Sequence, residues 1–257
     1  MIKQNDILAD LHMHTVASLH AYSSLSEMIN ASREAGYKYI AITDHLFQMQ
    51  DPIQQKNETA RIEYLSSRMR FEKDITVVGG AELNIGQEVI DIKKFKRAKG
   101  WLPLGLHSWF VDFDKMDIND LYQNFEKAAL ENNCSGFAHM ERDLYKFNKE
   151  YDNLVPETKK FFENMLLLSK KTGIPVELNE TSFVMEFHNP AHFIKYWLNL
   201  AKEIGGIKLY LGSDAHFYSE LGKFDNCLKA LNEISYPEEL IINIDENKIK
   251  KHLQLEE

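Results

Sequence analysis

Seven histidines and two carboxylates stand where short apolar runs of the chain end, and together they have the chemistry to bind several metal ions. Imidazole nitrogen and carboxylate oxygen are ligands that divalent transition metals prefer. One histidine in such a place is readily explained as a local hydrogen-bonding group without a metal. Nine groups placed alike favour one polynuclear centre, because unpaired polar groups crowded together would be costly. They are His12, His14, His20, His45, Glu82, His107, His139, Asp214 and His216.

The elements that must position these residues are predicted to alternate between strand and helix. Apolar runs predict strands over residues 7–11, 39–43, 75–81, 102–106, 136–138, 174–178 and 207–211. Helices are expected over about 24–36, 61–70, 120–132, 156–173, 190–204 and 221–234, with a last one closing the chain, and 88–92 is an extra strand or hairpin arm. Such alternation indicates an α/β fold with a parallel sheet and right-handed crossovers.

Local signals define several helix ends. Ser24 and Glu27 have the spacing of a capping box, and Gly36 is a natural left-handed stop. Pro156 suits the first position of a long helix that ends at Gly173. With the helix ends placed in this way, the candidate ligands lie after predicted strands and outside the predicted helices.

Residues at the carboxyl ends of parallel strands converge on one face, as they do in a closed β/α barrel. His12 and His14 are two residues apart and point to the same side of an extended strand, and Asp214 and His216 do the same. This spacing suits two ligands aimed at one cluster, so residues far apart in sequence are expected to meet in one pocket.

Bulk properties limit the function. The 257 residues, 44% of them hydrophobic, fit one barrel-sized domain over 1–257, and we find no linker that would divide it. The net charge of −9 argues against a broad nucleic-acid surface but not against a small anion. Cys134 and Cys227 form no CxxC motif and are interpreted as reduced thiols of a cytoplasmic protein, a disulfide between them being the alternative. Neither a signal peptide nor a membrane span is recognised.

The order of these motifs resembles the polymerase and histidinol phosphatase (PHP) family. The shared features are the opening His12-Met-His14, Thr43-Asp-His45, the lone Glu82, the two strand-end histidines and Asp214-Ala-His216. The opening segment 10–23, which includes His20, resembles the YcdX-type phosphatases within that family. The resemblance implies a distorted (β/α)7 barrel with a trinuclear centre of three zinc ions, with Mn or Fe as alternatives.

Carried over by motif, the resemblance implies three sets of ligands, which are listed here. One ion would take His12, His14, Glu82 and Asp214; a second would share Glu82 and add His107 and His139; a third would take His20, His45 and His216. Relatives often have His-Pro where this chain has His139-Met140, so the following loop is expected to differ and the substrate with it.

The implied activity is hydrolysis of a small phosphate monoester by a water that the metals activate, with no protein nucleophile. Three divalent ions bring about six positive charges and two carboxylates remove about two, so an anion is attracted. Histidinol-phosphate phosphatase and a phosphodiesterase or exonuclease are the alternatives, and a non-catalytic metal-binding module is a third. The oligomeric state stays open.

Five further residues are candidates for holding ligands or contacting substrate. Asp10 and Asp44 either orient the neighbouring imidazoles or cap a local backbone N–H. Glu177 and Asn179 end the sixth strand and face the same mouth, unless their role is purely structural. Arg142 either clamps phosphate or lies on the surface beside Glu141 and Asp143. The remaining histidines, His188, His192 and His252, are expected to be structural or exposed. Tyr22 and Ser23 are candidates for lining the pocket.

Overall fold

The strands of the protein are short, parallel and buried. The computed structural model describes residues 1–45, 72–85, 100–107, 115–131, 134–148, 153–185 and 190–255. The strands are β1 (Ala9–Met13), β2 (Tyr39–Ile42), β3 (Thr76–Gly79), β4 (Leu83–Asn84), β5 (Pro103–Gly105), β6 (Gly136–Phe137), β7 (Val176–Asn179) and β8 (Leu209–Gly212). The predicted helix over 61–70 and the predicted strand or arm over 88–92 lie outside the described residues.

The described strands form two parallel sheets, in the orders β1-β2-β3 and β4-β5-β6-β7-β8. The prediction of an α/β fold with parallel strands is therefore confirmed. Isolated parallel bridges join residues of the two sheets, between Met13 and Ala215 and between Gly80 and Trp101. The amide of His14 also donates to the carbonyl of Ala215 at 2.9 Å, so β1 lies next to the end of β8.

The strand predicted over 75–81 ends early in the structure, at Gly79 of β3, and the next strand, β4, belongs to the other sheet. Gly80 lies directly after β3, between the two strands. A Cβ at this position would come within 2.1 Å of the carbonyl oxygen of Trp101, so only glycine permits the backbones to approach this closely. The chain can then leave the first sheet and direct Glu82 towards the second.

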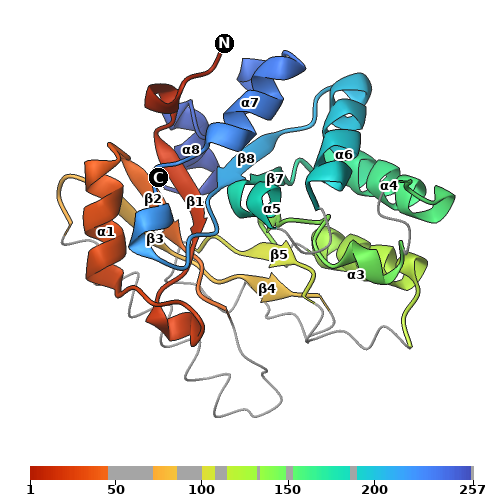
Figure 1. Cartoon of the computed structure of the whole chain (residues 1–257), viewed down its shortest axis with the longest axis horizontal. Helices are drawn as coiled ribbons and strands as arrows, with labels where there is room; N and C mark the ends of the chain where they lie inside the picture. Colours follow the sequence, from red (N-terminus) through yellow and green to blue (C-terminus); the bar gives the residue numbers. More distant parts are fainter. Residues whose placement is uncertain are drawn as a thin grey trace.

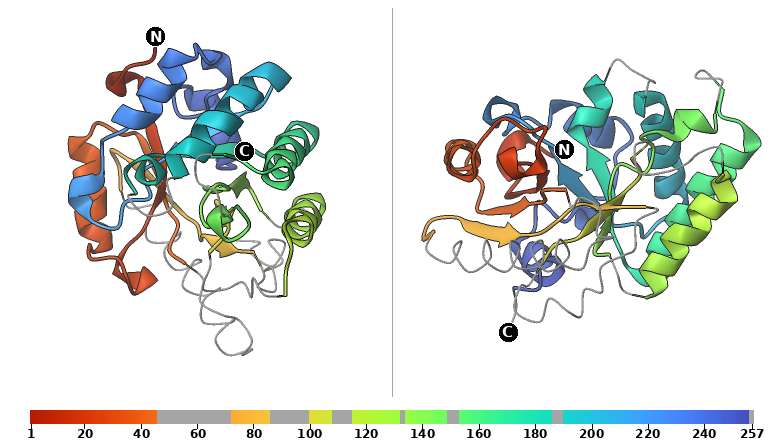
Figure 2. Two further views of the ribbon diagram at one scale, coloured as in Figure 1. Left: turned by 45° about the vertical axis from the view of Figure 1, so that its right-hand side comes forward. Right: turned by 90° about the horizontal axis from the view of Figure 1, so that it is seen from below.

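Helices cover the strands on both sides: α1 (Leu25–Glu34) lies on one side, and α3 (Ile118–Leu130), α4 (Pro156–Thr172) and α6 (Pro190–Ile204) lie on the other (Figures 1 and 2). The remaining helices are α5 (Glu180–Val184), α7 (Asp225–Glu233) and α8 (Glu246–His252), and 3-10 turns include η2 (Val16–Ser18) and η5 (Tyr218–Glu220). No described helix has the length and apolar character needed to cross a bilayer.

The helix ends follow the local signals in the sequence. Ser24 and Glu27 form the predicted capping box of α1, and Gly36 has a φ of 82° just beyond it. Pro156 is the first residue of α4, and Gly173 is its left-handed cap with a φ of 75°. The helix predicted over 221–234 begins later, at Asp225, because the preceding residues form η5 and a turn.

The core lies between these helices and the strands. Large side chains such as Trp101, Trp197 and Phe162 are fully buried there. Cys134 and Cys227 are free and buried, as the sequence predicted. This packing fixes the strand ends, from which the polar residues considered next project.

Candidate metal centre

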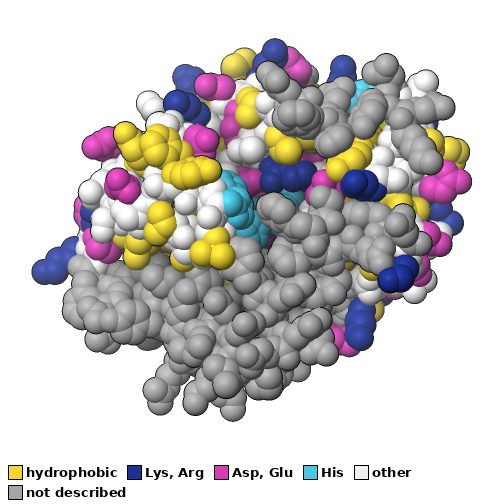
Figure 3. All heavy atoms as spheres, turned by 60° about the horizontal axis from the view of Figure 1, so that its bottom comes forward, with side chains coloured by type: hydrophobic (Ala, Val, Ile, Leu, Met, Phe, Trp, Pro, Cys, Tyr) yellow, Lys and Arg dark blue, Asp and Glu magenta, His cyan; other side chains and the backbone are white. Residues whose placement is uncertain are grey.

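All nine candidate ligands lie in the described part of the chain, and all except His20 lie within a strand or follow one. His12 is in β1 and His14 follows it, His45 follows β2, and Glu82 precedes β4. His107, His139 and the pair Asp214 and His216 follow β5, β6 and β8 respectively, whereas His20 comes after η2. Figure 3 shows histidine side chains in a hollow of this face, next to a basic side chain.

Glu82 lies at the centre of the cluster. Its Oε1 atom lies 2.6 Å from Nε2 of His139 and 3.3 Å from Nε2 of His107. Its Oε2 atom lies 3.3 Å from Nε2 of His12, 3.4 Å from Nε2 of His14 and 3.2 Å from Nδ1 of His45. Yet Oε2 is buried and makes no hydrogen bond to any described residue. Nitrogens that surround an oxygen without hydrogen bonding to it are typical of ligands arranged around metal ions.

Asp214 forms the second anionic position of the cluster. Its Oδ1 atom lies 3.0 Å from Nε2 of His14 and 3.6 Å from Nε2 of His12. Its Oδ2 atom lies 2.6 Å from Nη1 of Arg142. Asp214 is 2% exposed, so these charges face one another in a poorly hydrated environment.

His20 and His216 form the outer part of the cluster. The Nδ1 atom of His20 lies 2.7 Å from the carbonyl oxygen of Ser18, and that of His216 lies 2.8 Å from the carbonyl oxygen of Asp214. Because a carbonyl only accepts, each Nδ1 carries a proton, and in the neutral ring Nε2 then carries a lone pair. The two Nε2 atoms lie 2.8 Å apart, a distance that requires a shared proton or cation.

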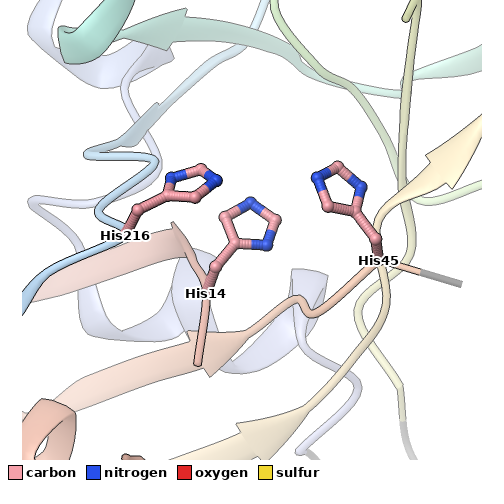
Figure 4. Close-up of side chains that lie close together, drawn as sticks. All are labelled: His14, His45 and His216. Carbon is pink, nitrogen blue, oxygen red and sulfur yellow. The ribbon is translucent and has the colours of Figure 1, made fainter. Parts of the chain in front are cut away.

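Among the described residues, four groups of ligand atoms are close enough to hold an ion. Within each group the atoms lie within 4.8 Å of one another. The close-up in Figure 4 shows one of them, in which the rings of His14, His45 and His216 enter the same space from three different strand ends. The groups are His14–His45–His216, His12–His14–Glu82, His45–Glu82–His107 and His12–His139–Glu177.

These groups overlap with the three expected sets of ligands but do not coincide with them. His14 groups with His45 and His216, where His20 was expected. His20 nevertheless lies close, since its ring centroid is 4.9 Å from that of His45 and 4.7 Å from that of His216. The geometry thus brings all nine side chains together.

The protonation of the metal-free cluster reflects competition between burial and charge. Burial lowers the pKa of His12, but Glu177, Glu82 and Asp214 outweigh it and hold that pKa well above its ordinary value. Burial likewise opposes the hydrogen bonds that raise the pKa of His14 to about 9. For His45, burial prevails and lowers the pKa to about 2. Metal binding at this site therefore requires protons to leave.

The pKa values of the two carboxylates in the cluster are held low by neighbouring positive groups, although burial raises them. Burial raises the pKa of Glu82, but the neighbouring histidines, His107 first among them, hold it well below the ordinary value. The pKa of Asp214 is also held well below its usual range, since Arg142 and His12 outweigh its burial. Both groups are thus anionic at neutral pH, the state in which a carboxylate binds a metal ion.

Glu177 makes direct contact with a candidate ligand. Its Oε1 atom lies 2.7 Å from Nδ1 of His12, and its Oε2 atom accepts the amide of His139 at 2.9 Å. A carboxylate at Nδ1 holds the proton there and leaves Nε2 of His12 as the lone-pair donor. β7 thereby orients a ligand on β1 and one after β6.

Asp10 and Asp44 hold the backbone and side chains around the ligands. The Oδ1 atom of Asp10 accepts the amides of His12 and Ser213, which matches the backbone-capping interpretation of this residue. Asp44 accepts the amide and hydroxyl of Thr15 and the hydroxyl of Ser18. Both carboxylates therefore fix the loops from which ligands project.

Arg142 is partly buried, and the interpretation of it as a surface arginine is wrong. Its side chain is 14% exposed and pairs with Asp214. Its Nη2 atom donates to Oδ1 of Asn179 at 3.1 Å and to Oγ of Ser182 at 3.3 Å. The amide of Arg142 donates to the carbonyl of His139 at 2.9 Å, and this turn places the guanidinium beside Asp214.

The other candidates do not belong to the ligand groups found among the described residues. His192, on α6, and His252, on α8, are half-buried and belong to none of the groups found among the described residues, while His188 lies outside those residues. Tyr22 is 77% exposed, and the hydroxyl of Ser23 accepts the amide of Tyr218.

Ser18 is a contact that the sequence did not reveal. Its hydroxyl oxygen lies 3.1 Å from Nδ1 of His14, donates to Asp44 and accepts the amide of His45. A serine in an uncharged loop carries no signal of such a role, because its three partners come from separate segments.

Two ligands have unfavourable backbone conformations. His139 has a φ of 23° and Asp214 a φ of 55°, both in the region that favours glycine. Such conformations cost about 1–3 kcal/mol each and tend to cluster at functional sites. The surrounding hydrogen bonds, including the 2.8 Å bond from the Asp214 amide to the His12 carbonyl, hold Asp214 in place.

The residues fit a set of divalent transition-metal ions. Oε2 of Glu82 lacks a hydrogen bond among the described residues although three imidazoles surround it, and the facing Nε2 atoms of His20 and His216 need a cation or proton between them. Mixed imidazole and carboxylate donors suit Zn, Mn or Fe.

Comparisons with known proteins find relatives along most of the chain. A probable phosphatase of Edwardsiella ictaluri (strain 93-146) is 28% identical over 249 residues, covering 95% of this chain and 93% of the relative. The probable phosphatase YcdX of Shigella dysenteriae serotype 1 (strain Sd197) is 27% identical over 251 residues, with the same coverage.

A solved structure shares the fold. It is a histidinol phosphate phosphatase from Lactococcus lactis, complexed with zinc, L-histidinol and phosphate; its TM-score is 0.59 at 18% identity, and the match covers 88% of this chain and 92% of that one. The family model described as the PHP domain matches residues 10–181, a range that contains seven of the nine candidate ligands, all except Asp214 and His216. The chain therefore belongs to the PHP domain family.

Proposed function

We propose that this chain is a metal-dependent phosphatase that hydrolyses small phosphate monoesters. The observation that carries the proposal is the convergence of seven imidazoles and the anionic carboxylates of Glu82 and Asp214, with Arg142 fixed beside them. The similar proteins described above are named probable phosphatases, and the solved one holds zinc and phosphate. Bound ions would supply a nucleophilic water at neutral pH and neutralise charge on the phosphoryl group.

The position of each ligand determines which ion it would hold. His12, His14, Glu82 and Asp214 would hold one ion, with Glu82 bridging to a second at His107 and His139; a third ion would lie among His20, His45 and His216. Glu177 orients His12 through Nδ1. Three zinc ions are our proposal, with Mn or Fe as alternatives.

Arg142 is positioned to bind substrate oxygen as well as Asp214. One of its nitrogens pairs with Asp214, and another is held by Asn179 and Ser182. The guanidinium group of Arg142 is therefore oriented before substrate binds, and it loses little conformational entropy when it binds an anion. We propose that it binds a phosphoryl oxygen of the substrate.

The fold supports this arrangement if the two sheets act as one. The bridges Met13–Ala215 and Gly80–Trp101 lead us to propose a distorted (β/α)7 barrel in a single domain over 1–257. Free, buried Cys134 and Cys227 favour action in the cytoplasm.

A histidinol-phosphate phosphatase is the second candidate, because the neighbour from Lactococcus lactis was solved with L-histidinol and phosphate. Turnover of histidinol phosphate far above that of other monoesters would favour it. A short single-stranded oligonucleotide tests the phosphodiesterase alternative, which the net charge of −9 disfavours.

Substitution of the ligands tests the proposal. His14→Ala and Asp214→Asn should abolish hydrolysis of 4-nitrophenyl phosphate by the zinc-loaded protein, because each removes a donor near the centre of the cluster. His252→Gln changes a histidine outside the ligand groups and serves as the matched control. Full activity in either ligand variant would overturn the proposed centre.

A further inference from the structure

Large apolar side chains that remain exposed are concentrated on two loops beside the candidate metal centre. Nine such residues occur in the described part of the chain, and five of them belong to these loops. Their exposed fractions range from 39% to 80%, and the five residues are Val16, Leu19, Tyr22, Phe217 and Tyr218. We call this group the apolar rim.

Hydrogen bonds join the two loops into one surface. The amide of Tyr22 donates to the carbonyl of His216 at 2.8 Å, and the amide of Tyr218 donates to the hydroxyl of Ser23 at 2.9 Å. The rings of Phe217 and Tyr218 lie with centroids 4.7 Å apart. The apolar rim is thus held in place by the same segments that carry His20 and His216.

The rim borders the open side of the centre. His12, His14 and His139 are 0% exposed, whereas His20 and His216 are half-buried, the side chain of His216 being 25% exposed. The outer pair is therefore more accessible than the buried donors, and the rim is built on the loops that carry this pair. Figure 3 shows hydrophobic side chains next to the histidines at the mouth of the hollow.

The rim offers little charge to a ligand. Residues 16–24 contain no Asp, Glu, Lys or Arg. Glu220 is the acidic group of the other loop, and its Oε2 atom already accepts the amides of His216 and Phe217 at 2.7 and 3.0 Å. Within the described segments 16–24 and 216–220 there is no Lys or Arg to pair with a polyanion, and the one carboxylate already accepts two amides. An exposed apolar patch at a site mouth is typical of a surface that receives an apolar ligand.

Leu19 gives a further reason to regard the rim as functional. It has a φ of 64° and a ψ of −20°, in the left-handed region, and it is 80% exposed. A leucine in this conformation is strained, and its side chain gains no burial in return. Contact with a bound ligand would supply that burial.

We propose that the apolar rim is the subsite for the alcohol part of the substrate, and that the preferred substrates are phosphate monoesters with an uncharged aromatic or aliphatic body. This inference rests on the proposed phosphatase function. With the phosphoryl group at the metals and Arg142, the ester oxygen and its substituent extend outward past His20 and His216, where Tyr22 and Phe217 cover them.

Two alkyl phosphates test the subsite without a change in leaving-group chemistry. The zinc-loaded full chain is assayed with 2-phenylethyl phosphate and with ethyl phosphate, both esters of primary alcohols. We expect kcat/KM to be about tenfold higher or more for the phenylethyl ester, since even one methylene group in an apolar pocket can give about tenfold. Equal values for the two esters would overturn the inference.

Variants then locate the preference. Tyr22→Ala and Phe217→Ala should each lower the ratio of the two kcat/KM values several-fold, and the double variant should bring the ratio close to one. Leu130→Ala removes an exposed apolar side chain on α3, 52% exposed and away from the rim, and should retain the wild-type ratio. Zinc content and thermal unfolding confirm that each variant folds and binds metal.

A binding measurement separates failure of the subsite from failure of the function. Calorimetric titration of the zinc-loaded protein with 2-phenylethylphosphonate and with ethylphosphonate should give a Kd about tenfold lower for the first. If neither ester is hydrolysed, the proposed function fails and this Kd ratio alone decides the subsite. Self-association that Tyr22→Ala abolishes, with equal Kd values, would instead identify the rim as a contact between copies and refute the proposal.

Discussion

The contact between Glu177 and His12 makes the sharpest prediction about this centre. Both side chains are 0% exposed, and Oε1 of Glu177 lies 2.7 Å from Nδ1 of His12. Glu177→Gln keeps an oxygen that can accept the Nδ1 proton but removes the negative charge. We expect zinc affinity to fall about 10- to 100-fold, or about 1.4–2.8 kcal/mol, as is usual when a partner of a metal-bound histidine is changed.

The pH dependence of this loss has a definite sign. Glu177 helps hold the pKa of His12 well above its ordinary value, so in the wild type a proton competes with the metal at neutral pH. The glutamine variant loses that proton at lower pH. Rising pH therefore improves zinc binding more in the wild type than in the variant, and the difference in affinity should grow between pH 6 and pH 8.5.

The assay is competition for zinc against a chromophoric chelator, together with kcat/KM for an aryl phosphate. Glu180→Gln is the matched control: this nearby glutamate is also buried, but its carboxylate accepts the amides of Asn226 and Cys227 and has no hydrogen bond to a ligand histidine. The control should lose stability without losing zinc affinity. Affinity of Glu177→Gln within twofold of the wild type would refute the role assigned to Glu177.

Three other changes have expected outcomes. Gly105→Ala places a Cβ 2.6 Å from Cε1 of His139 and 2.9 Å from Oε1 of Glu82, so the purified protein should hold less zinc by elemental analysis, and a full complement would contradict this geometry. Removal of zinc by a chelator should lower the melting temperature, because metal binds only the folded state, and an unchanged melting curve would argue against the site. Burial, with nearby lysines, lowers the pKa of half-buried His252 from 6.5 to about 4, so the unfolded state binds more protons between these values and stability is lost as pH falls through them. In the metal-free protein, His252→Gln should reduce this loss of stability between pH 7 and pH 4.5 by about 1–2 kcal/mol after solvent screening. Urea unfolding at the two pH values measures the loss. An identical loss in the wild type and the variant would exclude this histidine as the cause.

Several features could be predicted from the sequence because they depend on interactions between residues that are close in the chain. The capping box of Ser24 and Glu27 and the boundaries Pro156 and Gly173 depend on neighbours within a few residues, and they are found where they were predicted. The alternation of apolar strands with helices depends on periodicity in the same way. The convergence of the nine ligands follows from topology, because the carboxyl ends of parallel strands share one side of the sheet.

Other features depend on contacts between segments that are far apart in the sequence. The sequence predicted a strand over 75–81, but β3 ends at Gly79, where the backbone of Gly80 approaches that of Trp101, and the following β4 belongs to the other sheet. Arg142 has acidic neighbours in sequence, yet it pairs with Asp214, which the chain brings near only when β8 is in place. No local pattern contains either contact.

The sequence alone thus determined which residues bind metal in our proposal, since residue type and position at a strand end suffice for that choice. Only the tertiary structure decided which nitrogen of each imidazole faces the centre, that Glu177 orients His12 and that Ser18 contacts His14. The physical reason is that a ring nitrogen is selected by the hydrogen bond made by the other nitrogen of the same ring, and that partner comes from a different part of the chain.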